Sequence, residues 1–319
     1  MGNFFQLLVN EQLKLYIRKS TWIMYILIAL LVLGLAFINH NAMENSRTYE
    51  ASQDDNWRQT LQDENAEMQK EMEQKEMMQG AYTGQIEKNN YYLENDIQPR
   101  SYDTWQFVME NKFLLSLVSL LTIIIAAGIV ANEFKWGTIK LLLIRPITRT
   151  KILASKYVSV LLFALLTLLF VLIFSWIVGA LFFGVNGLNP HIVLNQSDGY
   201  AYVSIIGEII EGYGLQLITL VMMATFAFMI STIFRQSALA IGLAIFLMLS
   251  GNAIVGFFSH YDWAKYILFA NTNMNQYING SPMFDGMSLG FSIAVLAVYY
   301  VVFLVISWVF FTKRDIAGH

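Results

Sequence analysis

Residues 152–184 read ILASKYVSVLLFALLTLLFVLIFSWIVGALFFG, and after Lys156 this stretch contains no charged residue. About 20 consecutive apolar residues are enough to cross the ~30 Å hydrocarbon core of a bilayer as a helix. This stretch is longer, so it has room for an extension or a tilt. A helix that is apolar on every side has no face for water. The stretch therefore predicts a transmembrane helix.

Other apolar stretches approach or exceed the same length, at about 20–39, 113–131, 207–233, 237–258 and 289–311. Only 13% of the 319 residues are charged, against roughly 25% in ordinary soluble proteins. The first stretch follows Arg18 and Lys19 as a signal peptide would, but it is longer than a typical signal core and lacks a small-residue cleavage pattern. We expect an all-α polytopic membrane protein with about six transmembrane helices.

The distribution of basic residues predicts the orientation. Twelve Lys and Arg residues fall on one side of the expected spans: Lys14, Arg18, Lys19, Lys135, Lys140, Arg145, Arg149, Lys151, Lys156, Arg235, Lys313 and Arg314. Of the connections on the other side, 186–206 has no basic residue and 259–288 has only Lys265. Cytoplasmic loops carry the excess of positive charge. We therefore expect both termini in the cytoplasm and the chain in a cell membrane, the plasma membrane of a bacterium.

Residues 40–112 form the longest connection and contain fifteen acidic and seven basic residues. Long loops are largely exempt from the positive-inside rule, so we expect this loop outside the cell. Residues 53–79 are rich in Glu, Gln, Lys and Met without Pro or Gly, which favours helix. Leu61, Met68 and Met72 add a thin apolar stripe. Both a solvated helical cap and an ectodomain that gates substrate or binds a partner fit this pattern.

Residues 3–18 predict an amphipathic helix within an interfacial segment, 1–19. Its apolar stripe recurs every four residues, as does a polar stripe that includes Lys14 and Arg18. The apolar positions are Phe5, Val9, Leu13 and Ile17. Such a helix lies in the membrane interface, with Lys14 and Arg18 toward anionic headgroups. It can serve as an anchor alone or also seat a cytoplasmic partner.

Residues 132–156 read NEFKWGTIKLLLIRPITRTKILASK and lie on the cytoplasmic side by the charge argument. Thr138 can cap a short helix and Pro146 cannot continue one, and an apolar run lies between them. This helix is too short to span a membrane. An apolar face in the cytoplasm needs cover from headgroups or from another protein. Nearby basic residues would keep it at the membrane surface, where the groove of a partner can receive it.

The chain here resembles the ABC-2 type permeases, also called type V exporters. The resemblance rests on Glu133, Gly137-Thr138, Leu142-Leu143, Pro146, Arg149 and Lys156, and on the amphipathic N-terminal helix. It covers nearly all of the chain except the 40–112 loop. In that family the N-terminal helix is the elbow helix, and the segment matched by residues 132–150 contains the coupling helix that docks on a nucleotide-binding subunit.

The resemblance implies a permease subunit that forms half of an export pathway. Its partners would be a second permease subunit, identical or homologous, and a separate ABC ATPase that binds ATP and Mg. The implied coupling residues are Glu133, Lys135, Trp136, Gly137, Thr138, Ile139, Leu142, Leu143, Arg145 and Pro146. The phosphate-binding pattern GxxxxGK[ST] occurs nowhere in the chain. We therefore expect no ATPase activity and no cofactor in this chain alone.

The connection between the fifth and sixth spans, 259–288, is too apolar around Tyr266 for a plain solvated loop. The resemblance implies short re-entrant helices that line an outer gate. An interfacial aromatic belt of Tyr261, Trp263, Tyr266 and Tyr277 is the alternative interpretation.

Two further features of the spans are candidate sites. Glu208 and Glu211 lie three residues apart, so on one helix face, at the outer end of the fourth span. They are functional candidates because charge within a membrane is costly, but water at that level also permits an interfacial role. On the fifth span, the small pairs Ala238/Gly242 and Ala240/Ala244 favour close helix approach, with a second subunit or within one subunit.

Other functions have less support from the sequence. The chain has no Cys and no HExxH, and its four histidines fall in loops or the tail, so we assign no catalytic or metal-binding residue. We expect no nucleic-acid partner. A secondary transporter or channel would more often have inverted repeats, broken helices or buried charges. An intramembrane enzyme would need converging reactive groups. The cargo, amphipathic, hydrophobic or ionic, stays open.

Overall fold

The computed structural model describes residues 2–44, 55–74, 79–139, 147–196, 199–234, 236–278, 280 and 282–313. Within them, six helical stretches are long and apolar enough to cross a bilayer: Lys19–Met43, Thr104–Ile129, Arg149–Phe183, Ile205–Ile233, Ser237–Phe257 and Leu289–Lys313. The prediction of an all-α polytopic fold is confirmed. The protein is a multi-pass membrane protein.

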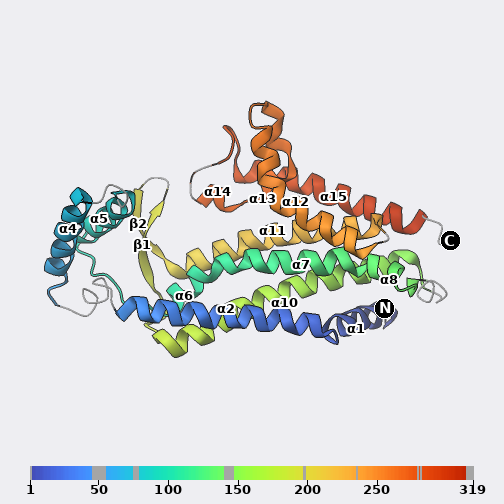
Figure 1. The fold of residues 1–319 in the computed structure, drawn as a ribbon, viewed down its shortest axis with the longest axis horizontal. Coiled ribbons are helices and arrows are strands. Elements are labelled where there is room, and N and C mark those ends of the chain that lie inside the picture. The colour runs from blue at the N-terminus through green and yellow to red at the C-terminus, as the bar shows by residue number, and fades with distance from the viewer. Residues whose placement is uncertain are drawn as a thin grey trace.

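Two of these helical stretches form the centre of the bundle. Helix α7 (Leu115–Ile129) packs against α11 (Ile205–Ile233) along much of its length, and α10 (Arg149–Phe183) contacts both. Helices α2 (Lys19–Glu44), α12 (Ser237–Phe257) and α15 (Leu289–Lys313) lie at the periphery (Figure 1). These three helices expose many of their large apolar side chains, as helices that face lipid do.

The second span begins earlier than predicted. Helix α6 (Thr104–Glu110) and the short 3-10 helix η2 (Asn111–Leu114) continue directly into α7, so the span starts at Thr104 and not at residue 113. The Asp103 carboxylate accepts hydrogen bonds from the backbone N–H groups of Trp105 and Gln106 and so caps α6. Glu110 and Lys112, predicted to lie in the 40–112 loop, are therefore part of the helical stretch.

The predicted 40–112 loop contains α4 (Trp57–Gln74) and α5 (Gln79–Glu94), which pack against each other. They adjoin an antiparallel hairpin, β1 (His191–Gln196) and β2 (Gly199–Ser204), that the sequence analysis did not predict. Trp57, Leu61 and Tyr92 bury their side chains together with Val193 of β1. Helix α4 is therefore part of a small packed unit and is not only a solvated cap.

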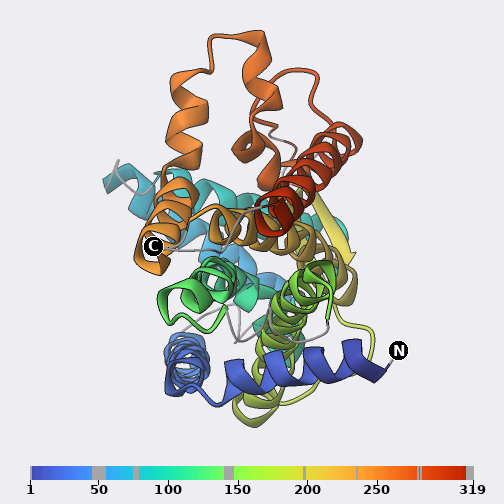
Figure 2. The same cartoon turned by 90° about the vertical axis from the view of Figure 1, so that its right-hand side faces the viewer.

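The bundle has two distinct ends, called here the α1 end and the hairpin end (Figure 1). Helix α1 (Gly2–Tyr16) and α8 (Ala131–Lys135) lie at the α1 end, where α10 begins and α15 finishes. The Arg149 guanidinium donates a hydrogen bond to the carbonyl of Thr312 there, at 3.0 Å. Figure 2 looks along the bundle and shows α1 lying across the direction of the spans.

Three short helices connect α12 to α15: η3 (Asp262–Tyr266), α13 (Leu268–Thr272) and α14 (Asn275–Ile278). Helix α13 packs against both α12 and α15. The described part of 259–288 therefore contains short helices that pack on the bundle. Its predicted role as an outer gate stays a prediction.

Candidate functional site

Helix α1 is amphipathic in a way that leaves one apolar stripe uncovered. Leu7, Glu11 and Leu15 are buried, and the Gln12 amide donates a hydrogen bond to the carbonyl of Ser159 on α10 at 2.8 Å. The predicted stripe points away from the protein and is exposed at Phe5, Val9, Leu13 and Ile17. An uncovered apolar stripe on a helix across the end of a membrane bundle suits the boundary between headgroups and acyl chains.

Four charged side chains meet where α1, α8 and α10 converge. The Lys156 ammonium of α10 lies 2.8 Å from Glu11 Oε2 and 2.8 Å from Glu133 Oε1. The Lys14 ammonium lies 2.9 Å from Glu11 Oε1 and 3.1 Å from Glu133 Oε1. Lys156 is fully buried, and Glu11 and Glu133 nearly so. A charge withdrawn from water is tolerated only when it is paired, and here each charge has two opposite partners.

The electrostatics of this charge cluster favour the ionised forms of Glu133 and Lys14. Burial raises the pKa of the Glu133 carboxyl, but Lys156, the Thr138 hydroxyl and Lys14 outweigh burial and hold that pKa at about 2, below its ordinary 4.5. Burial lowers the pKa of Lys14, but Glu11 and Glu133 raise it by more. At neutral pH both groups therefore carry their charges.

Lys14 and Arg18, predicted to face lipid headgroups, make contacts within the protein. The Lys14 ammonium bonds to the two carboxylates of the cluster. The Arg18 guanidinium carbon lies 5.2 Å from the centre of the Trp136 ring, within the range of a cation–π contact. Both side chains thus face the segment that follows the second span, because α1 lies beside it.

The segment 131–139 is held by further contacts. The Ser231 hydroxyl of α11 accepts hydrogen bonds from the backbone N–H groups of Val130 and Ala131, both at 3.1 Å, at the break between α7 and α8. Gly137 has φ +70°, a left-handed conformation that glycine adopts without steric cost. The Thr138 hydroxyl donates to the Glu133 carboxylate. Segment 131–139 is therefore attached to α1, α10 and α11.

The remaining coupling candidates have different positions. Lys135 and Trp136 are exposed at the α1 end, and Ile139 is buried in the main apolar core. Leu142, Leu143, Arg145 and Pro146 lie outside the described residues, as does most of the short helix predicted between Thr138 and Pro146.

The predicted gate segment uses buried polar side chains to satisfy its irregular backbone. The Asn271 amide donates to the carbonyls of Lys265 and Ile267, and the Thr219 hydroxyl of α11 donates to the carbonyl of Thr272 at 2.7 Å. Tyr277 bonds through its hydroxyl to Ser292 of α15. Non-helical backbone at membrane depth needs such internal partners or water.

A cavity of about 200 Å³ lies between this segment and helices α7, α11 and α12. Its lining carries no charged group and consists of Ser116, Ser119, Gln216, Thr219, Met223, Met248, Asn252, Phe269, Thr272, Asn273 and Asn275. Amides and hydroxyls of this kind can exchange hydrogen bonds with a neutral polar group, and Met and Phe can contact its apolar parts. This cavity was not predicted from the sequence, although Gln216 and Asn252 interrupt two apolar spans.

Comparison with known proteins places this architecture in a family. The family described as "Protein of unknown function (DUF2705)" matches residues 76–317, a range that includes Glu133, Lys156 and the cavity but not α1. The chain belongs to this family.

Two Bacillus subtilis (strain 168) proteins are similar to this DUF2705 chain. The uncharacterized protein YhcI is 42% identical over 319 residues, which cover 98% of this chain and 99% of that protein. The uncharacterized membrane protein YdbK is 34% identical over 205 residues, 63% of this chain and 78% of that protein. The name of YdbK agrees with the transmembrane helices found here.

The two glutamates of α11 differ in burial. Glu208 is buried in the first turn of the helix, whereas Glu211, three residues later, is exposed. A carboxylate near a helix N-terminus is favoured by the helix dipole, which supports a structural role for Glu208. Neither glutamate lines the cavity of this DUF2705 bundle. The other two gate candidates, Tyr266 and Tyr277, do not line it either. Within the described residues, no group of three or more His, Cys, Asp and Glu could hold a metal ion.

The two small-residue pairs of α12 also differ. Ala240 and Ala244 are fully buried in the main core, so this pair packs within the subunit. Ala238 and Gly242 are exposed, and a Cβ built at Gly242 meets nothing within 4 Å. Only the second pair offers a small face to a neighbouring helix of another chain.

Proposed function

We propose that this chain is the membrane-spanning permease subunit of an ATP-driven ABC exporter in the bacterial plasma membrane, with the α1 end in the cytoplasm. The chain supplies half of the pathway, and a separate ATPase subunit binds ATP and Mg. The observation that carries this proposal is the buried charge cluster, because Lys156 ties the segment after the second span to both α1 and α10.

The contacts of this segment suit the transmission of force. A partner that pushes on residues after Thr138 displaces α8, and the ion pairs of Glu133 pass that displacement to α10 and α1. The hydrogen bonds to Ser231 pass it to α11. Removing one member of a buried ion pair costs about 3–5 kcal/mol, so these connections resist separation. Trp136, exposed beside them, offers a contact surface to the ATPase.

The lining of the cavity supports an amphipathic cargo. Its amides and hydroxyls suit neutral polar groups, and its Met and Phe side chains suit apolar ones. A second permease subunit, identical or homologous, would complete the pathway.

The decisive experiment replaces Leu142 and Leu143 together by Asp and measures two things: co-purification with a co-expressed candidate ABC ATPase, and ATP turnover of the complex. Unpaired charge in an apolar docking groove costs several kcal/mol, about 3–5 by the usual penalty, which lowers affinity by orders of magnitude. We expect normal membrane insertion with loss of both the complex and its ATP turnover.

The control is Lys151→Asp, which places an acidic group on an exposed position at the same end of the bundle. We expect this variant to retain the complex. If the Leu142→Asp/Leu143→Asp protein inserts and keeps both the ATPase and its turnover, the segment is only an interfacial anchor and the proposal is wrong.

A further inference from the structure

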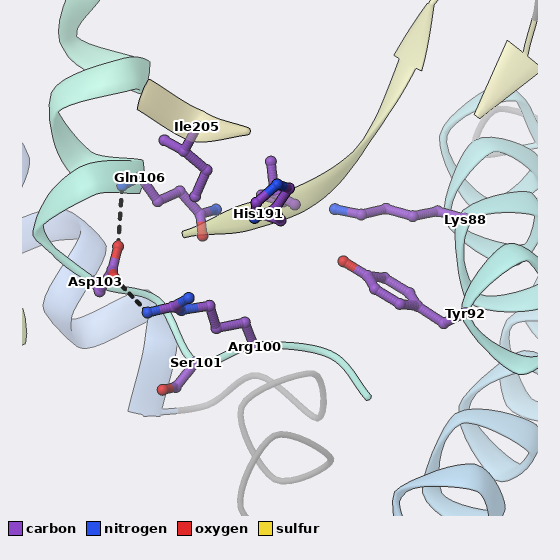
Figure 3. Close-up of a pocket in the computed structure, with 9 residues that line it drawn as sticks. Lys88, Tyr92, Arg100, Ser101, Asp103, Gln106, His191 and Ile205 are labelled. Carbon is purple, nitrogen blue, oxygen red and sulfur yellow. Dashed lines mark hydrogen bonds and ion pairs between the residues drawn. The ribbon is translucent and has the colours of Figure 1, made fainter. Parts of the chain in front are cut away.

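A second cavity, at the hairpin end, has a lining unlike the first. It measures about 50 Å³ and lies between α5, β1 and residues 100–106. One water needs roughly 10–15 Å³ by the same measure, so the space suits a few waters or one small ionic group. Its lining is Lys88, Tyr92, Arg100, Ser101, Asp103, Gln106, His191, Ile192 and Ile205. Figure 3 shows Lys88 and Tyr92 reaching from α5 toward His191, with Arg100 and Asp103 on the other side.

The cationic groups of this cavity are incompletely neutralised. No described carboxylate forms an ion pair with Lys88, whose pKa is lowered by burial and raised only in part by Glu110 and Glu64. Among the described residues, Arg100 forms one loose ion pair, with 3.5 Å between its Nη2 and Asp103 Oδ2. Lys88, Arg100 and Asp103 together leave one net positive charge. Half-buried cations with spare donors attract an anion.

Asp103 requires a ligand that can donate a hydrogen bond. Its Oδ1 accepts the two backbone hydrogen bonds that cap α6. The buried Oδ2 accepts no hydrogen bond of normal geometry from the described residues and has only the loose Arg100 contact. An unsatisfied carboxylate oxygen costs free energy until a donor reaches it. His191 Nδ1 lies 3.1 Å from the Asn189 carbonyl, which leaves Nε2 for a ligand. A ligand that combines an anion with a hydroxyl would satisfy both Asp103 and the cations.

We propose that this cavity binds a phosphoryl group that carries or adjoins a hydroxyl. Lys88 and Arg100 donate to the phosphoryl oxygens, and the hydroxyl donates to Asp103. Free hydrogenphosphate and the headgroup of phosphatidylglycerol share this chemistry. The membrane is close, because the second span starts at Thr104 and the Trp105 indole, an interfacial side chain, donates to the Gly187 carbonyl. The site does not depend on ATP coupling.

The test uses the purified full chain in a neutral detergent and follows thermal unfolding. The titrants are inorganic phosphate, dihexanoyl phosphatidylglycerol and dihexanoyl phosphatidylcholine. We expect saturable stabilisation of the wild-type protein by phosphate, phosphatidylglycerol or both, and none by phosphatidylcholine. Lys88→Gln and Arg100→Gln should weaken this binding at least tenfold. Lys70→Gln, the same substitution on an exposed position of α4, should leave it unchanged.

The pattern of response identifies the source of the phosphoryl group. Saturation by phosphatidylglycerol alone indicates a lipid headgroup, and saturation by phosphate alone indicates a free anion. Saturation by both indicates a site that recognises only the phosphoryl group that they share. Three results would overturn the proposal: no saturable response, an equal response to phosphatidylcholine, or unchanged binding in both Lys88→Gln and Arg100→Gln proteins of normal helix content.

Discussion

The Lys156 ammonium lies 2.8 Å from Oε1 of Glu133 and has no exposed surface, so a cation within a span-length helix is matched to a carboxylate just after another span. Glu11 and Lys14 of α1 complete the arrangement. A buried charge is strongly destabilising without its partner. The position of the segment after the second span is therefore coupled to the stability of the whole α1 end.

Replacing Lys156 by Met tests this coupling. Glu11 and Glu133 would stay buried and share only Lys14, so we expect a loss of about 3–5 kcal/mol in the free energy of unfolding. The double variant Glu133→Gln/Lys156→Met removes one charge of each sign and should regain part of that loss. Unfolding in detergent, followed by circular dichroism, measures both effects.

Lys151→Met is the matched control, because Lys151 lies on the same helix and is exposed. It should change the free energy of unfolding little. Equal stability of the Lys156→Met and Lys151→Met proteins would show that the charge cluster does not stabilise the fold.

The pKa of Glu133 predicts a dependence on pH. This pKa is about 2 in the folded protein and 4.5 as the ordinary value, so Glu133 stabilises the fold fully above about pH 4.5. That contribution is lost as the pH falls from 4.5 toward 2. The difference in free energy of unfolding between wild type and Glu133→Gln should be constant from pH 8 to 5 and shrink below 4.5. A difference that already shrinks between pH 8 and 6 would contradict this prediction.

The charge cluster shows what the sequence could reveal. Lys14, Glu133 and Lys156 could each be selected from motifs and amphipathic patterning, but Lys156 and Glu11 are 145 positions apart. Their contact depends on how α1 lies across the bundle, which no local pattern encodes. Glu11 itself was missed because it belongs to neither stripe of the predicted helix. The available signal was the position of Glu11 four residues from both Leu7 and Leu15, which places the acid on an apolar helix face.

The hairpin end was the least predictable part of the fold. The spans followed from apolar length alone, because the bilayer imposes that length. Leu61 and Val193 belong to one buried cluster, although the second and third spans separate them along the chain. The β-branched Ile192 and Val193 and the Asp198-Gly199 pair were signals of a hairpin. These signals are weaker than those of the long apolar stretches around them.

Gly251 of α12 tests how the gate segment is positioned. A Cβ built at Gly251 would lie 2.4 Å from Cδ1 of Phe269 on α13, whereas one built at Gly256 meets nothing within 4 Å. Gly251→Ala should therefore displace Phe269 and destabilise the protein by about 1–3 kcal/mol, the usual cost of overpacking. Gly256→Ala should be neutral or stabilise by up to about 1 kcal/mol through helix propensity. Thermal unfolding of the pair measures the contrast, and equal melting temperatures would refute the close packing.

Gly242 tests the proposed pairing of two permease subunits. Its exposed, small surface lets a second α12 approach closely. Gly242→Leu should reduce cross-linking between subunits through α12. Gly290→Leu is the control, since Gly290 of α15 is also exposed with nothing within 4 Å of a built Cβ. If Gly242→Leu cross-links as well as Gly290→Leu, the subunits meet elsewhere.

The orientation can be tested with single cysteines, because the chain has none. Gln62 on α4 and Lys135 on α8 are both exposed and lie at the hairpin end and the α1 end. The excess of basic residues near the α1 end predicts that it faces the cytoplasm. An impermeant maleimide should therefore label Gln62→Cys and not Lys135→Cys in intact cells. Permeabilised cells should show both labelled, which proves both thiols reactive. Labelling of Lys135→Cys but not Gln62→Cys in intact cells would show the opposite orientation. Segment 131–139 would then lie outside the cell, where a cytoplasmic ATPase cannot bind it.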